Sequence, residues 1–124
     1  MATFSEKQCF IVAGASSGIG RAIALLLNAS GASVIGLARQ VELLESLKQE
    51  AAYPECMFTE RVDLAADPAS IPAYVAQLRT KYGKFQGVAF CAGTGQVKPV
   101  RAVTDEELRR TFEINFFAPF MMAK

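Results

Sequence analysis

The sequence predicts an α/β fold, a doubly wound parallel sheet with helices on both faces. Short apolar runs alternate four times with longer segments of helical periodicity along the 124 residues. Such alternation with right-handed crossovers produces a parallel sheet between two helical layers. The first apolar run also leads directly into a glycine-rich turn and then a helix. Because no repeat, linker or low-complexity segment interrupts this order, we expect one domain, residues 1–124.

Four buried strands are expected at residues 8–13, 33–38, 56–62 and 86–91, where the sequence is mostly apolar. The doubly wound arrangement predicts the strand order 3-2-1-4, with the sheet as the middle of three αβα layers. A ligand of such a sheet binds at the carboxyl ends of the strands, near the switch point between the first and fourth strands.

Each strand is followed by an expected helix. The first runs from residue 19 to a stop at Gly31, the second covers 41–52, and the third begins at Asp67 and Pro68 and ends at Gly83. The fourth begins with a capping box at residues 104–107 and runs towards Lys124, after a glycine- and proline-containing loop at 93–103. Apolar residues at helical spacing predict the buried faces of the first three: Ile19, Ile23, Leu26 and Leu27; Leu43, Leu44 and Leu47; Ile71, Tyr74, Val75 and Leu78.

Composition narrows the function. The net charge of +1 gives no sign of nucleic-acid binding, and the lack of histidine excludes His-based triads and the commoner zinc sites. The three cysteines, Cys9, Cys56 and Cys91, form no Cys-x-x-Cys motif and lie in apolar runs, so we expect reduced core thiols and a cytoplasmic location. No signal peptide or membrane-spanning run is expected.

The glycine-rich turn has the spacing Gly-x-x-x-Gly-x-Gly, from Gly14 to Gly20. Glycines allow close approach of the backbone to a ligand, and the N–H groups and dipole of the following helix attract an anion. Residues Gly14, Ser16, Ser17, Gly18, Ile19 and Gly20 are therefore candidates for holding a pyrophosphate. The alternative is an ordinary strand-to-helix loop.

The stretch GASSGIGRAIA, residues 14–24, resembles the short-chain dehydrogenase/reductases, nicotinamide-dependent oxidoreductases with a Rossmann-type domain. The resemblance covers essentially all of this chain but only about the first half of a family member. The family usually has Thr before the glycine turn, where this chain has Ala13, so the turn is expected to be slightly looser.

NADP(H) is the expected cofactor, in preference to NAD(H). An NAD site usually places an acid at the end of the second strand, but this chain has no acid between Glu6 and Glu42. It has Arg39 there, whose guanidinium suits a 2'-phosphate and matches the family's NADP-preferring pattern. Ser16 and Ser17 could contact the same phosphate, and Arg21 is a weaker candidate. The alternative for Arg39 is a solvated residue at the helix entrance.

The resemblance assigns further contacts. Asp63 matches the position whose carboxylate meets the adenine amino group, with Leu64 beside the ring; capping of the following loop is the alternative. The family's Asn-Asn-Ala-Gly motif is kept here only at Ala92 and Gly93, whose backbone would run beside the ribose. Phe90 and Cys91 stand in place of the two asparagines.

Asn115 matches the family's active-site asparagine, whose backbone carbonyl holds a water of the proton relay. Pro119 lies four residues later and has no N–H, so an α-helix cannot satisfy the Asn115 carbonyl, and we expect a kink or a bound water. The alternative is a polar residue on an apolar helix.

The family's catalytic Ser and Tyr-x-x-x-Lys pair would follow a fifth strand, and the 124 residues contain neither that strand nor a substitute pair. We therefore expect the cofactor-binding half of an NADP(H)-dependent oxidoreductase acting on a carbonyl or alcohol, inactive as this chain stands. The alternatives are a non-catalytic nucleotide-binding or oligomerising module and a non-functional truncation product. Self-association is expected, because the edge of the fourth strand and the aromatic end of the last helix lack cover: Phe116, Phe117, Phe120, Met121 and Met122.

Overall fold

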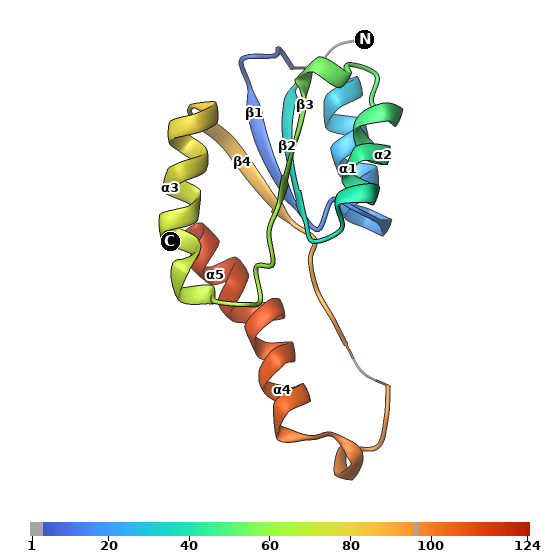
Figure 1. The fold of residues 1–124 in the computed structure, drawn as a ribbon, viewed down its shortest axis with the longest axis vertical. Helices are drawn as coiled ribbons and strands as arrows, with labels where there is room; N and C mark the ends of the chain where they lie inside the picture. The colour runs from blue at the N-terminus through green and yellow to red at the C-terminus, as the bar shows by residue number, and fades with distance from the viewer. Residues whose placement is uncertain (1–3, 96) are drawn as a thin grey trace.

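A computed structural model describes residues 4–95 and 97–124 and contains one four-stranded parallel sheet. Its strands are β1 (Cys9–Ala13), β2 (Ser33–Ala38), β3 (Met57–Arg61) and β4 (Phe85–Phe90), in the order β3-β2-β1-β4 (Figure 1). The predicted parallel sheet and strand order are confirmed. No strand boundary differs from the predicted one by more than one residue.

Helices cover both faces of the sheet. Helices α1 (Gly18–Ala29) and α2 (Val41–Glu50) lie on one face, and α3 (Ile71–Tyr82) and α5 (Ala118–Ala123) lie on the other (Figure 1). Helix α4 (Asp105–Phe112) projects beyond the carboxyl edge of the sheet, and a π-helical turn, Glu113–Phe117, joins it to α5. The three αβα layers that the sequence predicts are therefore present.

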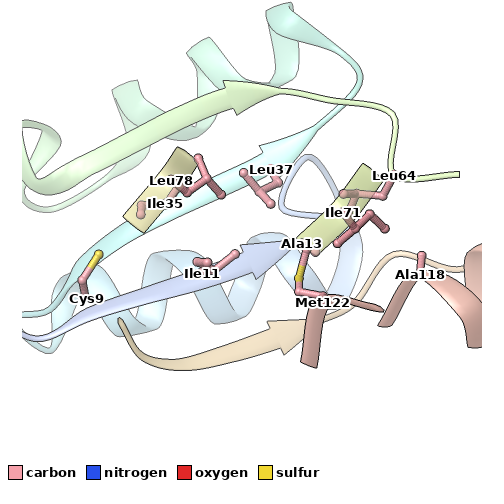
Figure 2. Packing of buried hydrophobic residues seen from close by; sticks show 10 residues of the cluster. All are labelled: Cys9, Ile11, Ala13, Ile35, Leu37, Leu64, Ile71, Leu78, Ala118 and Met122. Atoms are coloured by element: carbon pink, nitrogen blue, oxygen red, sulfur yellow. The ribbon is translucent and has the colours of Figure 1, made fainter. Parts of the chain in front are cut away.

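Alternate residues of the central strand supply two cores, as the period of a strand requires. Ile11 and Ala13 face the α3 and α5 side, where they pack with Leu37, Leu78 and Met122 (Figure 2). Val12 faces the α1 and α2 side and packs in a cluster that includes Ala24, Val34, Leu44, Leu47 and Met57. These two cores hold the carboxyl ends of the strands in fixed positions relative to the helices.

The predicted buried face of α1 is half right: Ile23 and Leu27 are partly buried against the core on this side of the sheet, whereas Ile19 and Leu26 are not. Ile19 and Leu26 are 76% and 68% exposed, and the buried residues of this helix are Gly20, Ala24 and Asn28. The small residues let α1 approach the sheet closely, so the larger side chains pack at the margins of the contact or, at Ile19 and Leu26, face outward. The buried amide of Asn28 bonds the backbone N–H and C=O of Tyr53, so its burial leaves no polar group of that amide unpaired.

Several helix ends differ from the prediction. Residues Pro68–Ser70 form a separate 3-10 turn, so α3 begins at Ile71, and α2 already ends at Glu50. Ser17 occupies the N-cap position of α1, but its side chain makes no capping hydrogen bond. In contrast, the predicted capping box at the start of α4 is present, with Thr104 and Glu107 bonding each other's backbone N–H groups.

The last predicted helix is interrupted where Pro119 indicated a disruption. The π-helical turn Glu113–Phe117 replaces regular α-helical bonding there, and α5 resumes at Ala118. On this segment Phe116, Phe117 and Phe120 are about half exposed, as expected. The expectation that both methionines lack cover is wrong: Met122 is buried, and Met121 is packed partly against the core.

Candidate functional site

The glycine-rich turn packs closely against the residues that follow β4 and against the first turn of α1. Gly14 has φ of 81°, and a Cβ added there would lie 2.5 Å from the backbone nitrogen of Ala92. A Cβ on Gly20 would lie 2.0 Å from the carbonyl oxygen of Gly14. Gly18 has φ of 59° with open space around it. The turn therefore needs glycine for two reasons, close packing at Gly14 and Gly20 and left-handed backbone at Gly14 and Gly18.

This turn also places the N-terminus of α1 at the carboxyl edge of the sheet. The N–H groups of Gly14 and Ala15 donate to the Leu37 carbonyl at 2.9 and 3.1 Å, which fixes the turn to the end of β2. The first N–H groups of a helix have no partner within the helix, and the dipole is positive there. The arrangement suits an anion bound over residues 16–20.

A cavity of about 370 Å³ opens at this edge, lined by residues from the ends of all four strands and by α4. Eight of the predicted site residues line it: Gly14, Ser16, Ser17, Arg39, Asp63, Leu64, Ala92 and Gly93. Gly18, Ile19, Gly20 and Asn115 do not line it. The side chain of Ile19 is largely exposed, so what this residue can offer a ligand at the turn is its backbone.

The charged groups on the cavity wall are Arg39, Arg110 and Asp63. Arg39 is exposed at the end of β2, and its carbonyl accepts a hydrogen bond of 3.1 Å from the Nε of Arg61. Two guanidinium groups against one carboxylate favour an anionic ligand.

Arg21 is engaged elsewhere. Its guanidinium forms an ion pair of 3.1 Å with Glu50 and donates to the Leu43 carbonyl and the Ser46 hydroxyl, which joins α1 to α2. These bonds explain its position without a phosphate.

Asp63 has the capping bond that the sequence left as an alternative. Its Oδ1 accepts a hydrogen bond of 3.0 Å from the backbone N–H of Ala65, which shapes the loop after β3. Leu64 is 6% exposed and belongs to the core on the α3 side, so it lines the cavity while it stabilises the fold.

Asn115 joins the π-helical turn to the loop after β4. Its side-chain oxygen accepts from the Thr94 N–H at 2.8 Å, and its amide donates to the Thr94 carbonyl at 2.6 Å. A Cβ on Gly93 would lie 3.1 Å from the Asn115 Oδ1. The asparagine therefore fixes the path of residues 93–94, which line the cavity.

Sequence reasoning missed Arg110 and Ile114, which reach the cavity from α4 and the π-helical turn. They are four residues apart and so lie on one side of a helical segment. Their spacing, and their position beside Asn115, could have marked them as neighbours of the site. Nothing in the sequence alone shows that this segment lies at the carboxyl ends of the strands.

A second polar cluster lies between β3 and α3, outside this cavity. Glu60 accepts hydrogen bonds from Lys81 at 3.0 Å and from the Tyr82 hydroxyl at 2.8 Å. Burial would raise the pKa of Glu60, but these hydrogen bonds outweigh it and the pKa is lowered. Burial raises the pKa of nearby Tyr74 to about 12, helped by the negative charge of Glu60. The cluster joins a strand to a helix and needs no ligand.

Within residues 4–95 and 97–124, no group of three or more acidic or cysteine side chains is placed to hold a metal ion. None of the helices in those residues is long and apolar enough to span a bilayer.

The cavity's donors are backbone N–H groups, hydroxyls and guanidinium groups, and its apolar lining includes Leu37, Val62 and Ile114. That combination fits a ligand with both phosphates and a flat base, and its place at the carboxyl edge is the ligand site of Rossmann-type sheets. Fold and site are thus those of a Rossmann-type sheet with a cavity at its ligand-binding edge.

Comparison with known proteins identifies the family. The family model for short chain dehydrogenase matches residues 8–124. D-erythrulose reductase of Gallus gallus is 34% identical over 108 residues, which cover 87% of this chain and 41% of that protein. The chain belongs to the short-chain dehydrogenase family.

Solved structures agree with this assignment. A short-chain dehydrogenase from Streptomyces avermitilis has a TM-score of 0.85 and 35% identity, covering 99% of this chain and 43% of that one. A metagenomic short-chain oxidoreductase, solved in complex with NADP, has a TM-score of 0.84 and 28% identity, covering 95% and 54%. The chain thus spans about half, or somewhat less, of the proteins it resembles.

Proposed function

We propose that this chain is the NADP(H)-binding half, residues 1–124, of a cytoplasmic oxidoreductase that transfers hydride between the cofactor and a carbonyl or alcohol substrate. The observation that carries the proposal is the cavity at the carboxyl edge of the sheet, which the glycine turn and Arg39 both line. When bound, the cofactor supplies the hydride. The family assignment supports this chemistry, and the NADP complex of a similar structure supports the choice of cofactor.

The chain's own residues would divide the cofactor between them. Backbone N–H groups of residues 14–20 and the hydroxyls of Ser16 and Ser17 would bind the pyrophosphate. Arg39 would pair with the 2'-phosphate, since a guanidinium matches phosphate geometry. Asp63 and Leu64 would face the adenine, and Ala92 and Gly93 the ribose.

Asn115 is the one catalytic-class residue proposed in this chain. Its side-chain bonds to Thr94 hold the π-helical turn against the loop after β4, and Pro119, four residues later, has no N–H to donate to the Asn115 carbonyl. A carbonyl in this setting suits a bound water of a proton relay. No tyrosine in the sequence is followed four residues later by lysine, so we propose that these 124 residues bind cofactor without turning it over.

The test is a titration of the purified chain with NADPH and with NADH, followed by fluorescence of the reduced nicotinamide, since the protein has no Trp. We expect saturable binding, tighter for NADPH. Arg39→Asp should weaken NADPH binding at least 10-fold, because a charged hydrogen bond contributes about 1.5–3 kcal/mol, and should affect NADH little.

Arg79→Asp is the matched control. Arg79 lies in the last turn of α3, which leads into the start of β4, so it is at the sheet edge away from the cavity. Its reversal changes the net charge equally and should leave both affinities unchanged. Failure of the wild-type chain to bind either nucleotide would refute the proposal, and so would equal losses in the two variants.

A second candidate function, an oligomerising module, is favoured by one observation. Exposed apolar side chains follow one another along α4, the π-helical turn and α5, at 49–59% exposure: Leu108, Phe112, Phe116, Phe117 and Phe120. We propose that this surface and the edge of β4 mediate homo-oligomerisation. Phe120→Glu should lower the mass measured by sedimentation, whereas Leu26→Glu, an exposed apolar position on α1, should not.

A further inference from the structure

Arg110 is a cavity residue whose guanidinium is not committed to the protein. Its neighbour Arg109 forms an ion pair of 2.7 Å with Asp105, four residues earlier. Arg110 has Glu106 at the same spacing, yet no ion pair within 4.0 Å of Arg110 occurs among residues 4–95 and 97–124. Arg110 instead lines the cavity, where it is exposed.

The surroundings of Arg110 differ from those of the expected phosphate donors. The α1 N-terminus, Ser16, Ser17 and Arg39 come from the ends of β1 and β2. Arg110 shares its wall with Ile114, one helical turn away on the segment that leads to α5. Helix α5 packs against α3 and against the turn Pro68–Ser70, which follows the cavity-lining loop 62–65.

Val62, Leu64 and Ile114 therefore give the cavity apolar surface on the α3 side, with the Asp63 carboxylate among them, a lining that suits a purine. Helix α4 projects outward from the sheet (Figure 1), and Arg110 belongs to this helix, whereas Ile114 belongs to the π-helical turn that leads to α5. A guanidinium is planar, weakly hydrated and stacks on aromatic faces. Arg110 is in the position to extend this lining from α4.

We propose that Arg110 is a binding residue for the adenosine end of the cofactor, with its guanidinium lying flat on the purine ring. This inference rests on the proposed dinucleotide function. It makes Arg110 distinct from Arg39: Arg39 would select between the two cofactors through the 2'-phosphate, whereas Arg110 would contact a group that both cofactors share. Its removal should thus cost affinity without changing selectivity.

The experiment is isothermal titration calorimetry of the purified chain with NADPH and NADH, using Arg110→Ala and the matched control Arg109→Ala. Arg110→Ala should weaken both nucleotides by a similar factor, about 2- to 30-fold, the range for an arginine stacked on an aromatic face. Arg109→Ala removes the same charge one residue away and loses only an exposed ion pair, so its affinities should equal those of the wild type. Thermal unfolding without ligand should be alike for both variants.

Arg110→Lys separates stacking from charge, because lysine keeps the charge but has no planar face. We expect it to lose most of the affinity that Arg110→Ala loses. Full recovery in Arg110→Lys, or a loss confined to NADPH, would mean a phosphate contact and would overturn the stacking proposal. Unchanged affinity in Arg110→Ala would overturn it as well. Absence of binding by the wild-type chain would instead refute the dinucleotide function on which it rests.

Discussion

Gly20 lies in the first turn of α1, where substitution by alanine would ordinarily stabilise a protein. Alanine is about 1 kcal/mol more favourable than glycine within a helix. Here, however, the new Cβ would lie 2.0 Å from the Gly14 oxygen and 2.8 Å from the Gly14 carbon. We predict that Gly20→Ala destabilises the protein.

The magnitude follows from that contact. Real Cβ atoms essentially never come within 3.0 Å of such atoms, so a separation of 2.0 Å requires α1 and the turn to move apart by about 1 Å. The movement is resisted because Gly14 is held by its bond to Leu37 and by contact with Ala92. Overpacking of this kind costs about 1–3 kcal/mol or more, and the gain in helix propensity offsets about 1 kcal/mol. Because 2.0 Å is far below the 3.0 Å limit, the upper figure of about 3 kcal/mol applies, so we expect a net loss of about 2 kcal/mol, a fall in Tm of about 8 °C.

Urea unfolding followed by far-ultraviolet circular dichroism measures this loss, at two protein concentrations so that self-association is detected. Gly18→Ala is the comparison, because Gly18 has φ of 59° but nothing within 4 Å of its added Cβ. It should cost about 1 kcal/mol, from backbone strain alone. If Gly20→Ala proved as stable as the wild type while Gly18→Ala lost stability, the close seating of α1 on Gly14 would be wrong.

Three further predictions concern the polar contacts. Asn115→Ala should cost about 1 kcal/mol in urea unfolding, since it removes both hydrogen bonds to Thr94. Tyr74→Phe should leave stability at pH 7 unchanged or raised, because the buried hydroxyl has no hydrogen-bond partner among residues 4–95 and 97–124. Burial raises the pKa of Tyr74 to about 12, so between pH 10 and 12 the hydroxyl ionises more readily in the unfolded chain than in the folded protein. The wild type therefore keeps its full stability below pH 10 and loses part of it as the pH rises towards 12. The variant, which lacks the hydroxyl, should lose less stability over that range. Glu60→Gln should destabilise the protein more at pH 7 than at pH 3. Burial opposes the shift, but the hydrogen bond from Lys81 helps to lower the pKa of Glu60. The stability that the Glu60 carboxylate contributes is therefore present above pH 4.5 and is lost as the pH falls.

Each of these has a result that contradicts it. Equal stability of Asn115→Ala and the wild type would mean that the loop after β4 is held by other contacts. A clear loss in Tyr74→Phe at pH 7 would reveal a partner for the hydroxyl, such as water. For Glu60→Gln, the same loss at both pH values would show that packing of the side chain, rather than its charge, matters.

The sheet was predictable because its information is local and redundant. Each strand is a short apolar run followed by a helix, and chirality leaves few ways to connect such units. Apolar periodicity predicted the buried face of α1 only in part: it found Ile23 and Leu27, but close packing at Gly20 and Ala24 determines the rotation of that helix. Periodicity counts large side chains, so it assigned Ile19 to the core although its side chain faces solvent.

The same division applies to the site. Cavity residues of the glycine turn and the strand ends could be found because strand order places these segments at one edge and the family resemblance picks out positions within them. Arg110 comes from a helix that is placed at the cavity by the packing of α5 and by the Asn115–Thr94 hydrogen bonds, and no local pattern encodes these contacts. Arg21 shows the reverse case, in which a cation next to the turn is directed by Glu50 towards a neighbouring helix.

The π-helical turn at Glu113–Phe117 gives the end of the chain an unusual sensitivity to length. A π turn accommodates one residue more than an α turn, and each residue of an α-helix turns the chain by about 100°. Deleting a single residue there would restore α-helical spacing through the segment, although Pro119 would still leave one carbonyl without an N–H partner. It would also rotate the following helix so that Ala118 and Met122 left the core and Phe117 or Phe120 turned towards the sheet. The extra residue thus sets the rotation of α5 about its own axis. An insertion or deletion at this place would therefore alter the fold more than a substitution would.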